Sequence, residues 1–336
     1  IGVFLFLMTL AALGSPVRAG GTLRYVNIDL ATGANNGASW ADAFQGSQGL
    51  QNALALSTAG DEIWCAAGSY RTTDTTDRTI SFQLMTDVAI YGGFDGTETT
   101  REERDPALNE SILSADLQGP NSFHVVQADG VTNAVLDGFT IEEGGANGVL
   151  PNDRGAGIYV FNGSEVTIAN CKIQSNVAAG SGGGLYVIDS ALTMTDCLVT
   201  SNIADWGAGA FVFNSTFDIS SSQIIGNVAV TDFGGGLRIA DGSTGSIDGT
   251  TFIANGAGQA GGAIAIEDTG STISITDCAF TGNHVSLPGA DGGAVQVDDS
   301  DVDLPGCTFT LNQADALGAG GALLIEVTFS WPGIAL

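Results

Sequence analysis

Four aspartates in one short stretch are the densest set of potential metal ligands in this sequence. Asp298, Asp299, Asp301 and Asp303 could gather carboxylate oxygens, which calcium prefers as ligands. Asp301 and Asp303 are two positions apart, so in a strand both side chains lie on the same face. The spacing matches neither the EF-hand loop nor the Gly-Gly-x-Gly-x-Asp nonapeptide. Calcium binding is therefore one interpretation, and a solvated acidic edge is the other.

Cysteine and histidine could also support metal or redox chemistry. Four of the five cysteines recur at one position of a repeated segment: Cys171, Cys197, Cys278 and Cys307. Ser222 and Thr250 stand at this position in other copies, so packing of small side chains explains the column. We expect stacked free thiols rather than disulfides, although an exported protein could be oxidised. The sequence has no Cys-x-x-Cys, and His124 and His284 are far apart, so no zinc site is expected.

An aromatic strip is the candidate binding surface. Tyr159, Tyr186 and Phe211 occupy one position of successive repeats, and Arg238 follows them. Their alternation with apolar neighbours predicts that these side chains point outward. Aromatic faces could stack on sugar rings or on a partner protein. Ordinary cross-strand pairing of aromatic residues in a sheet is the alternative interpretation.

The elements that would position these residues come from a repeat that begins at residue 155. Each copy starts with a glycine-rich tripeptide, such as Gly-Gly-Gly at 182–184 within GGGLYV, and contains three short stretches of period-two alternation. Successive copies are 27, 25, 27, 27, 31 and 28 residues apart, measured at Ile158, Leu185, Ala210, Leu237, Ile264, Val295 and Leu323. A constant period brings equivalent strands side by side and parallel. The prediction is an all-β fold, a right-handed single-stranded parallel β-helix with three faces and about 4.8 Å per coil.

Asparagine provides a second landmark in the same repeat. Each asparagine follows an apolar position by three residues, and the six form one column: Asn176, Asn202, Asn227, Asn255, Asn283 and Asn312. We expect this column at a corner of the coil. There the amides would bond to one another along the stack, and asparagine tolerates the left-handed dihedral angles that a corner can require.

The chain is predicted to contain a leader followed by one domain. Residues 1–19 combine an apolar run with a breaker cluster and a small-residue cleavage site, which is typical of a signal peptide. Residues 20–336 form a single β-helix domain, with a cap and irregular first coils over 20–154 and regular coils of about 27 residues over 155–336. Within the first part, residues 47–58 predict a helix that plugs the end of the core. Strands are expected at 23–26, 62–66, 80–84, 88–91, 123–126 and 134–141.

Charge limits the possible partners. The 336 residues carry 37 acidic and nine basic side chains, a formal charge of −28, and Lys172 is the only lysine. Nucleic acids and anionic membrane surfaces need clustered basic residues, so neither is an expected partner. No stretch after the leader is apolar enough to cross a membrane. The expected partners are glycans or surface proteins.

Two motifs carry a family resemblance. Gly-Gly-Ala-[Ile/Val/Leu] at 261–264, 292–295 and 320–323 is paired with Phe-x-x-Asn at 252–255, 280–283 and 309–312. This pairing resembles the polymorphic outer membrane protein repeat of secreted and surface β-helix proteins of bacteria. The segments 25–27, 64–70 and 90–94 resemble the opening coils of the pectate-lyase-like superfamily. The resemblance implies export to the extracellular space or the bacterial outer membrane, but it says little about activity.

The superfamily also contains enzymes. Its lyases combine a calcium-binding aspartate cluster with a basic residue, and its hydrolases use carboxylates flanked by histidine and Arg-x-Lys. Here Arg238 is followed by Ile239 and Ala240, and Lys172 has no carboxylate cluster in its own coil. We therefore assign no catalytic residue and no cofactor, and expect an exported, non-catalytic scaffold for adhesion or for glycan or protein binding. The alternative is a calcium-dependent polysaccharide lyase or glycoside hydrolase acting on acidic polysaccharide.

Overall fold

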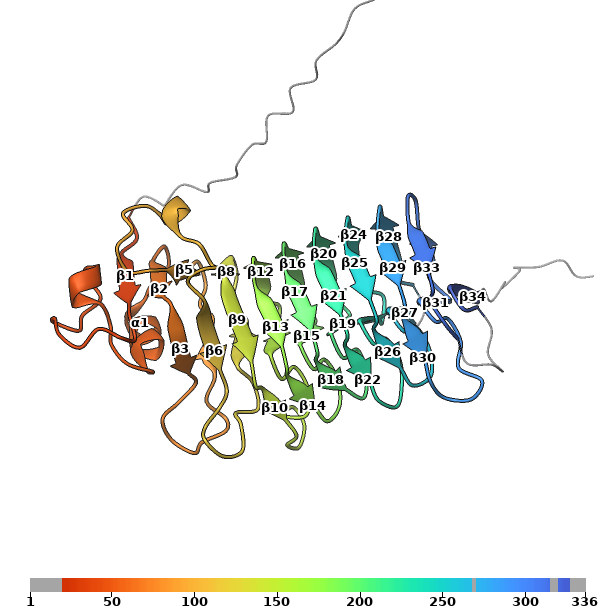
Figure 1. Ribbon diagram of the computed structural model, residues 1–336, viewed down its shortest axis with the longest axis horizontal. Coiled ribbons are helices and arrows are strands. Elements are labelled where there is room, and N and C mark those ends of the chain that lie inside the picture. Colours follow the sequence, from red (N-terminus) through yellow and green to blue (C-terminus); the bar gives the residue numbers. More distant parts are fainter. Residues whose placement is uncertain (1–19, 268–269, 315–319, 327–336) are drawn as a thin grey trace, which may run out of the picture.

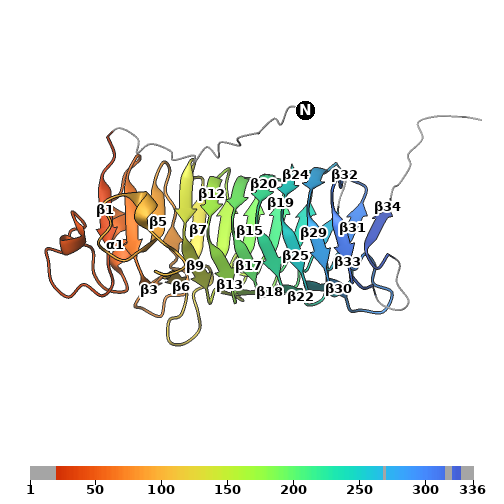
Figure 2. The same cartoon turned by 45° about the horizontal axis from the view of Figure 1, so that its top comes forward.

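The structure is a computed structural model that describes residues 20–267, 270–314 and 320–326. The expected signal peptide, residues 1–19, lies outside the described residues. The described chain winds into a right-handed parallel β-helix, as the repeat predicts (Figures 1 and 2).

Four parallel sheets, named A to D, run along the solenoid. Sheet A contains β1 (Leu23–Val26), β2 (Glu62–Ala66), β5 (Ala89–Phe94), β8 (Ala134–Asp137), β12 (Glu165–Ala169), β16 (Ala191–Thr195), β20 (Thr216–Ser220), β24 (Thr244–Asp248), β28 (Thr272–Thr276) and β32 (Asp301–Asp303). Sheet B contains β3 (Gly68–Arg71), β6 (Ser111–Ser114), β9 (Phe139–Glu142), β13 (Lys172–Gln174), β17 (Leu198–Thr200), β21 (Gln223–Ile225), β25 (Thr251–Ile253), β29 (Ala279–Thr281) and β33 (Thr308–Thr310).

Sheet C contains β4 (Phe82–Gln83), β7 (Val126–Asp129), β11 (Ile158–Phe161), β15 (Leu185–Ile188), β19 (Ala210–Phe213), β23 (Leu237–Ala240), β27 (Ile264–Ile266), β31 (Val295–Asp298) and β34 (Leu323–Glu326). Sheet D is narrow and has two-residue strands: β10 (Gly145–Ala146), β14 (Val177–Ala178), β18 (Ile203–Ala204), β22 (Val228–Ala229), β26 (Gly256–Ala257) and β30 (His284–Val285). A regular coil visits the sheets in the order C, A, B, D. The three expected faces are therefore sheets C, A and B, and sheet D is a short additional side.

Residues in the left-handed region make the corners between sheets A and B. This position is Gly138 (φ +83°), Asn170 (φ +49°), Asp196 (φ +52°) and Ser221 (φ +49°) in successive coils. One such residue reverses the outward and inward alternation and bends the strand direction without an added loop. It also explains why the single strand expected over 134–141 is divided into β8 and β9 at Gly138.

The asparagine ladder is confirmed, and the left-handed residue of this corner lies one position before each asparagine. Asn202 donates from its backbone N–H and from Nδ2 to Asn227 Oδ1, both at 3.0 Å, and the pattern repeats from Asn176 to Asn312. The left-handed residue is the one before each asparagine, such as Ser201 (φ +56°) or Ala254 (φ +54°). The ladder asparagines themselves do not adopt positive φ angles. Their side chains instead form the hydrogen bonds that stabilise the turn.

Like residues stack on like residues through the core. Val160 pairs with Val187, which pairs with Val212, and all three side chains are fully buried. Dry stacks of this kind contribute about 25 cal/mol per Å² of apolar area removed from water. The core of the described coils is therefore continuous from one coil to the next.

A helical cap closes the amino-terminal end. Helix α1 (Gly49–Leu56) buries Leu50, Ala53 and Leu54, which confirms the expected plug. The structure also describes two 3-10 turns, η1 (Trp40–Asp42) and η2 (Arg101–Glu103). Asp61 fastens the chain beside the helix through an ion pair with Arg24 at 3.2 Å. Burial raises the pKa of Asp61, but two backbone N–H groups and Arg24 outweigh burial, and the net pKa lies below its usual value.

Candidate functional site

The aromatic strip forms the column that the repeat predicts. In sheet C, Tyr159 lies beside Tyr186, Tyr186 beside Phe211, and Phe211 beside Arg238. Ring centroids are 5.6 Å apart between the two tyrosines and 5.3 Å apart between Tyr186 and Phe211. The four side chains therefore lie in one continuous column along the outer face of the sheet.

The column is covered, which corrects the expectation of an open stacking surface. Tyr159, Tyr186 and Phe211 are only 3–7% exposed. Phe161 stacks on Tyr159 at 4.4 Å, and Arg154 donates to the Tyr186 hydroxyl at 3.2 Å while lying 5.1 Å from the ring centroid. Neighbouring outer side chains and a loop arginine thus seal the aromatic faces. Burial also raises the pKa of the Tyr159 and Tyr186 hydroxyls.

At Arg238 the column changes from aromatic side chains to a charged one. Its guanidinium lies 4.7 Å from the Phe211 ring centroid and 4.6 Å from that of Trp206, which is 40% exposed. Arg238 Nε and Nη2 each lie 2.7 Å from Glu267 Oε2. This ion pair is buried, so Arg238 is occupied by Glu267 and by the aromatic rings rather than presented to solvent.

A cleft of about 430 Å³ lies beyond this ion pair, between sheet C and the loops that lead into it from sheet D. Phe233, Leu287 and Pro288 give it an apolar side, and Glu267, Gln296 and Asp298 give it a polar side. We call this hollow the sheet-C cleft. Gln296 is 7% exposed, and its Oε1 is a buried acceptor without a hydrogen-bond partner in the described part of the chain. A buried acceptor without a partner costs about 1–3 kcal/mol, so this position favours a ligand that brings a donor.

Sequence reasoning did not select Gln296 as a site residue, although the ladder contained the signal. Gln296 pairs with Ala265, and Ala265 pairs with Arg238. Following the aromatic column two coils further would have reached it. Its unpartnered oxygen, in contrast, depends on loops far away in the sequence.

The structure does not assemble the aspartate run into a calcium site. Asp301 and Asp303 lie exposed at the two ends of β32, on its outer face as predicted. No group of three or more histidine, cysteine, aspartate or glutamate side chains within the described ranges could hold a metal ion. A strand and its turn spread the four carboxylates along an edge instead of around one point.

The remaining candidate residues have structural surroundings. All five cysteines are free, and burial raises the pKa of Cys197 and Cys278 to about 12, so these thiols are poor nucleophiles. His124 is buried and donates from Nδ1 to the Gly155 carbonyl at 3.0 Å. Burial lowers the pKa of His124. His284 lies exposed in sheet D.

Comparisons with known proteins concern the fold. Residues 124–314 match the family described as "Right handed beta helix region". The solved structures similar to this chain include pectate lyase Pel9A, with 12% identity, a TM-score of 0.45 and coverage of 84% of this chain and 78% of that one. A polygalacturonase from Erwinia carotovora ssp. carotovora has 13% identity, a TM-score of 0.48 and coverage of 86% and 80%.

One curated protein, "Metabotropic glutamate receptor-like protein R" of Dictyostelium discoideum, is 32% identical over 136 residues. The match covers 40% of this chain and 8% of that protein. The shared segment is therefore a small part of its relative.

Proposed function

The chain belongs to the right-handed β-helix family, and from that premise we propose that it is an exported, non-catalytic scaffold that binds a glycan in the sheet-C cleft. The rigid stack of coils supplies the scaffold, and the cleft supplies the recognition. Residues 1–19 are proposed to be a signal peptide, and residues 20–336 a single domain. The paired Gly-Gly-Ala and Phe-x-x-Asn motifs support display at a cell surface, as in polymorphic outer membrane proteins.

The unpartnered Gln296 oxygen is the observation that carries this proposal. A sugar hydroxyl can donate to Oε1, and the carboxylates of the cleft accept further hydroxyl hydrogen bonds. Phe233 and Leu287 offer apolar contact to the carbon side of a sugar ring. A site that combines orienting polar groups with apolar walls is typical of small-ligand recognition.

Charge indicates which glycans are favoured. The chain carries −28 overall, and Glu267, Asp291 and Asp298 all line the cleft. An acidic polysaccharide would be repelled over distances comparable with the Debye length. A neutral glycan avoids this repulsion, so neutral sugars are the proposed ligands.

No helix in the described part of the chain is long and apolar enough to cross a membrane.

A polysaccharide lyase or glycoside hydrolase is the alternative function. Carboxylates line the sheet-C cleft, and glycosidases use pairs of carboxylates. Incubation with acidic polysaccharides and calcium distinguishes the two functions. Depolymerisation that is lost when Asp298 is replaced by asparagine would overturn the scaffold proposal.

Calorimetric titration with neutral hexasaccharides tests the glycan proposal. Gln296→Leu removes the acceptor at nearly constant size and should weaken binding about tenfold, which corresponds to about 1.4 kcal/mol. The same variant should unfold at a higher denaturant concentration without ligand, because it removes an unsatisfied buried group. Thr193→Leu, on the exposed face of sheet A, is the matched control and should change neither quantity. Unchanged binding in Gln296→Leu would contradict the assignment.

A further inference from the structure

A second hollow runs along the corner between sheets A and B. It has a volume of about 630 Å³ and crosses four coils, over β9, β13, β17 and β21, which lie side by side in Figure 1. We call it the corner groove. Its volume lies within the range of about 300–1,000 Å³ that is usual for ligand sites.

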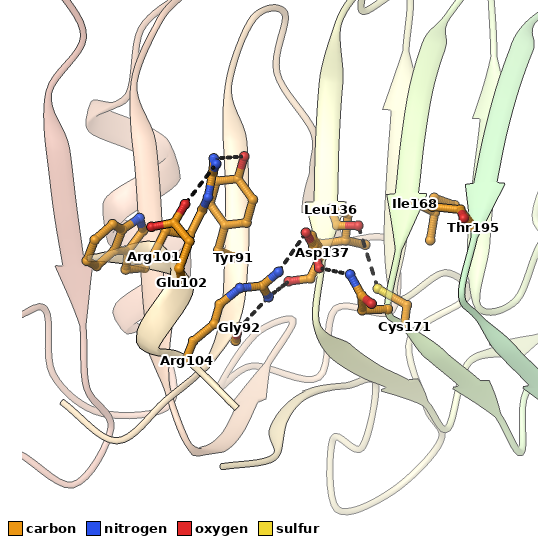
Figure 3. Close-up of polar contacts among 12 residues, drawn as sticks. Tyr91, Gly92, Arg101, Glu102, Arg104, Leu136, Asp137, Ile168, Cys171 and Thr195 are labelled. Atoms are coloured by element: carbon orange, nitrogen blue, oxygen red, sulfur yellow. Dashed lines mark hydrogen bonds and ion pairs between the residues drawn. The ribbon is translucent and has the colours of Figure 1, made fainter. Parts of the chain in front are cut away.

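One wall of the corner groove is a loop that is fixed in place. Asp105, Pro106, Ala107 and Glu110 form this wall, between β5 and β6. Arg104 anchors the loop through an ion pair with Asp137 at 2.7 Å and a hydrogen bond to the Gly92 carbonyl at 3.0 Å (Figure 3). The Arg104 and Asp137 side chains are each 13% exposed, so this pair serves the wall rather than a ligand.

Gly138 shows how closely the wall packs against the sheet. Its φ is +83°, and a Cβ there would lie 2.4 Å from Arg104 Nη1 and 2.9 Å from the Gly92 carbonyl oxygen. Only glycine permits both the conformation and the close approach. The groove is therefore shaped before any ligand arrives.

The floor of the corner groove presents donors that have no partner within the described ranges. Lys172, Leu198 and Gln223 occupy one position of three successive strands of sheet B. Lys172 is half-buried and Gln223 is exposed. Neither side chain makes a hydrogen bond or an ion pair with the described part of the chain. Lys172 contributes up to three N–H donors, and the Gln223 amide contributes two.

Acceptors surround these donors. Glu110 accepts a hydrogen bond from the Thr140 hydroxyl at 2.7 Å, and Asp105 and Asp196 also line the groove. A ligand that satisfies both kinds of group must itself donate and accept, which is the property of a hydroxyl. Three carboxylates around one ammonium disfavour an acidic ligand, and Pro106 and Leu198 provide apolar contact for sugar rings.

We propose that the corner groove is a glycan-binding site for a linear neutral glycan, separate from the sheet-C cleft. Four coils at about 4.8 Å spacing give a floor about 14 Å long, enough for a chain of several sugar residues. The site stands on its own residues and does not depend on the cleft. Because the coil order is C, A, B, D, the corner groove lies diagonally across the solenoid from the loops of the cleft. If both sites bind, one molecule links two glycan chains, and that consequence alone rests on the proposed function.

Calorimetry with cello-, manno- and xylohexaose tests the corner groove in a Gln296→Leu background, where the cleft is weakened. We expect one site per chain for at least one of these hexasaccharides. Lys172→Ala with Gln223→Ala, and separately Ala107→Trp, which fills the groove from its wall, should each weaken that binding at least tenfold. Thr308→Ala lies in the same column of sheet B outside the groove and is the matched control.

The outcomes separate the two proposals. Binding that survives Ala107→Trp, or the absence of binding by all three hexasaccharides, would overturn the corner site. Preference for an acidic hexasaccharide over the neutral ones would overturn the ligand class. Binding that is lost in the groove variants but unchanged by Gln296→Leu would support the corner site and contradict the sheet-C cleft.

Discussion

Replacement of Asn227 by leucine is the sharpest perturbation of the ladder that holds the coils together. Asn227 is fully buried, and its side chain makes four hydrogen bonds. Its Oδ1 accepts from the Asn202 backbone N–H and from Asn202 Nδ2, both at 3.0 Å. Its Nδ2 donates to the Val199 carbonyl and to Asn255 Oδ1, both at 3.0 Å.

The expected loss of stability follows from these four bonds. Each contributes about 0.5–1.5 kcal/mol net, so their sum is about 2–6 kcal/mol. Leucine also leaves the buried Asn202 backbone N–H without its acceptor, while Asn202 Nδ2 keeps only its bond to the Ile173 carbonyl, which favours a value near about 4 kcal/mol. With an m value of about 3 kcal/mol per molar urea, the unfolding midpoint should fall by about 1.3 M.

Urea unfolding followed by far-ultraviolet circular dichroism measures this shift, and two controls calibrate it. Asn312→Leu removes three side-chain bonds at the half-buried end of the ladder, where water can replace them, so the loss should be smaller. Gln223→Leu changes an exposed position in the same coil as Asn227 and should stay within about 0.5 kcal/mol of the unmodified protein. A midpoint for Asn227→Leu equal to that of Gln223→Leu would refute the reasoning.

Three further predictions concern other parts of the coil. Ala254→Gly should raise the free energy of unfolding by about 0.5–1 kcal/mol, because Ala254 is held at φ +54°, which glycine adopts without strain. An unchanged or lower melting temperature of this variant would contradict the prediction. Tyr186→Ala should cost about 3–5 kcal/mol of stability yet leave hexasaccharide affinity unchanged, since the ring is buried beneath its neighbours, and a fall in affinity would restore the ring as a ligand contact. The pKa of Asp61 is lowered in the folded chain. Its ionised carboxylate therefore stabilises the folded state above the unfolded pKa of about 3.9, and this stabilisation is lost as the pH falls through the lower pKa of the folded state. As the pH is lowered from 6 to 2, the unfolding midpoint of Asp61→Asn should therefore fall less steeply than that of the unmodified protein. Equal falls in the two proteins would contradict this.

The repeat was sufficient to predict the fold because a β-helix is nearly one-dimensional. Equivalent residues such as Ile158 and Leu185 are adjacent in sheet C, and Asn202 and Asn227 are adjacent in the ladder. Contacts of this kind are fixed by the period alone. The sequence did not show which residue of this corner takes the left-handed conformation. Asparagine tolerates it, but the preceding residue, such as Ser201 or Ala254, adopts it in the structure.

The solvent exposure of the outward-facing residues could not be predicted from the period of the sequence repeat. Alternation places Tyr186 on the outer face, but Arg154 covers it from a loop. The cover comes from a side chain outside the strands, and its position depends on tertiary packing. Gln296 was accessible to the same ladder reasoning, but its missing hydrogen-bond partner was not.

The corner groove was missed for a related reason. Lys172 has no carboxylate cluster in its own coil, yet Glu110 reaches the groove from two coils before it and Asp196 from the next coil. The position of the wall loop could not be predicted, because the pairing of Arg104 with Asp137 links segments that share no repeat. Sites on a solenoid are therefore assembled across coils and must be sought along columns.

The distance between spin labels placed along one column of sheet A tests the stacked-coil claim most directly. Thr167, Ser246, Ser274 and Asp303 lie in one register of the sheet. Labels at Thr167 and at each of the other three should be about 14, 19 and 24 Å apart, because each coil adds about 4.8 Å. Distances that do not rise in equal steps along this series, or that exceed 40 Å for residues 167 and 303, would contradict the account.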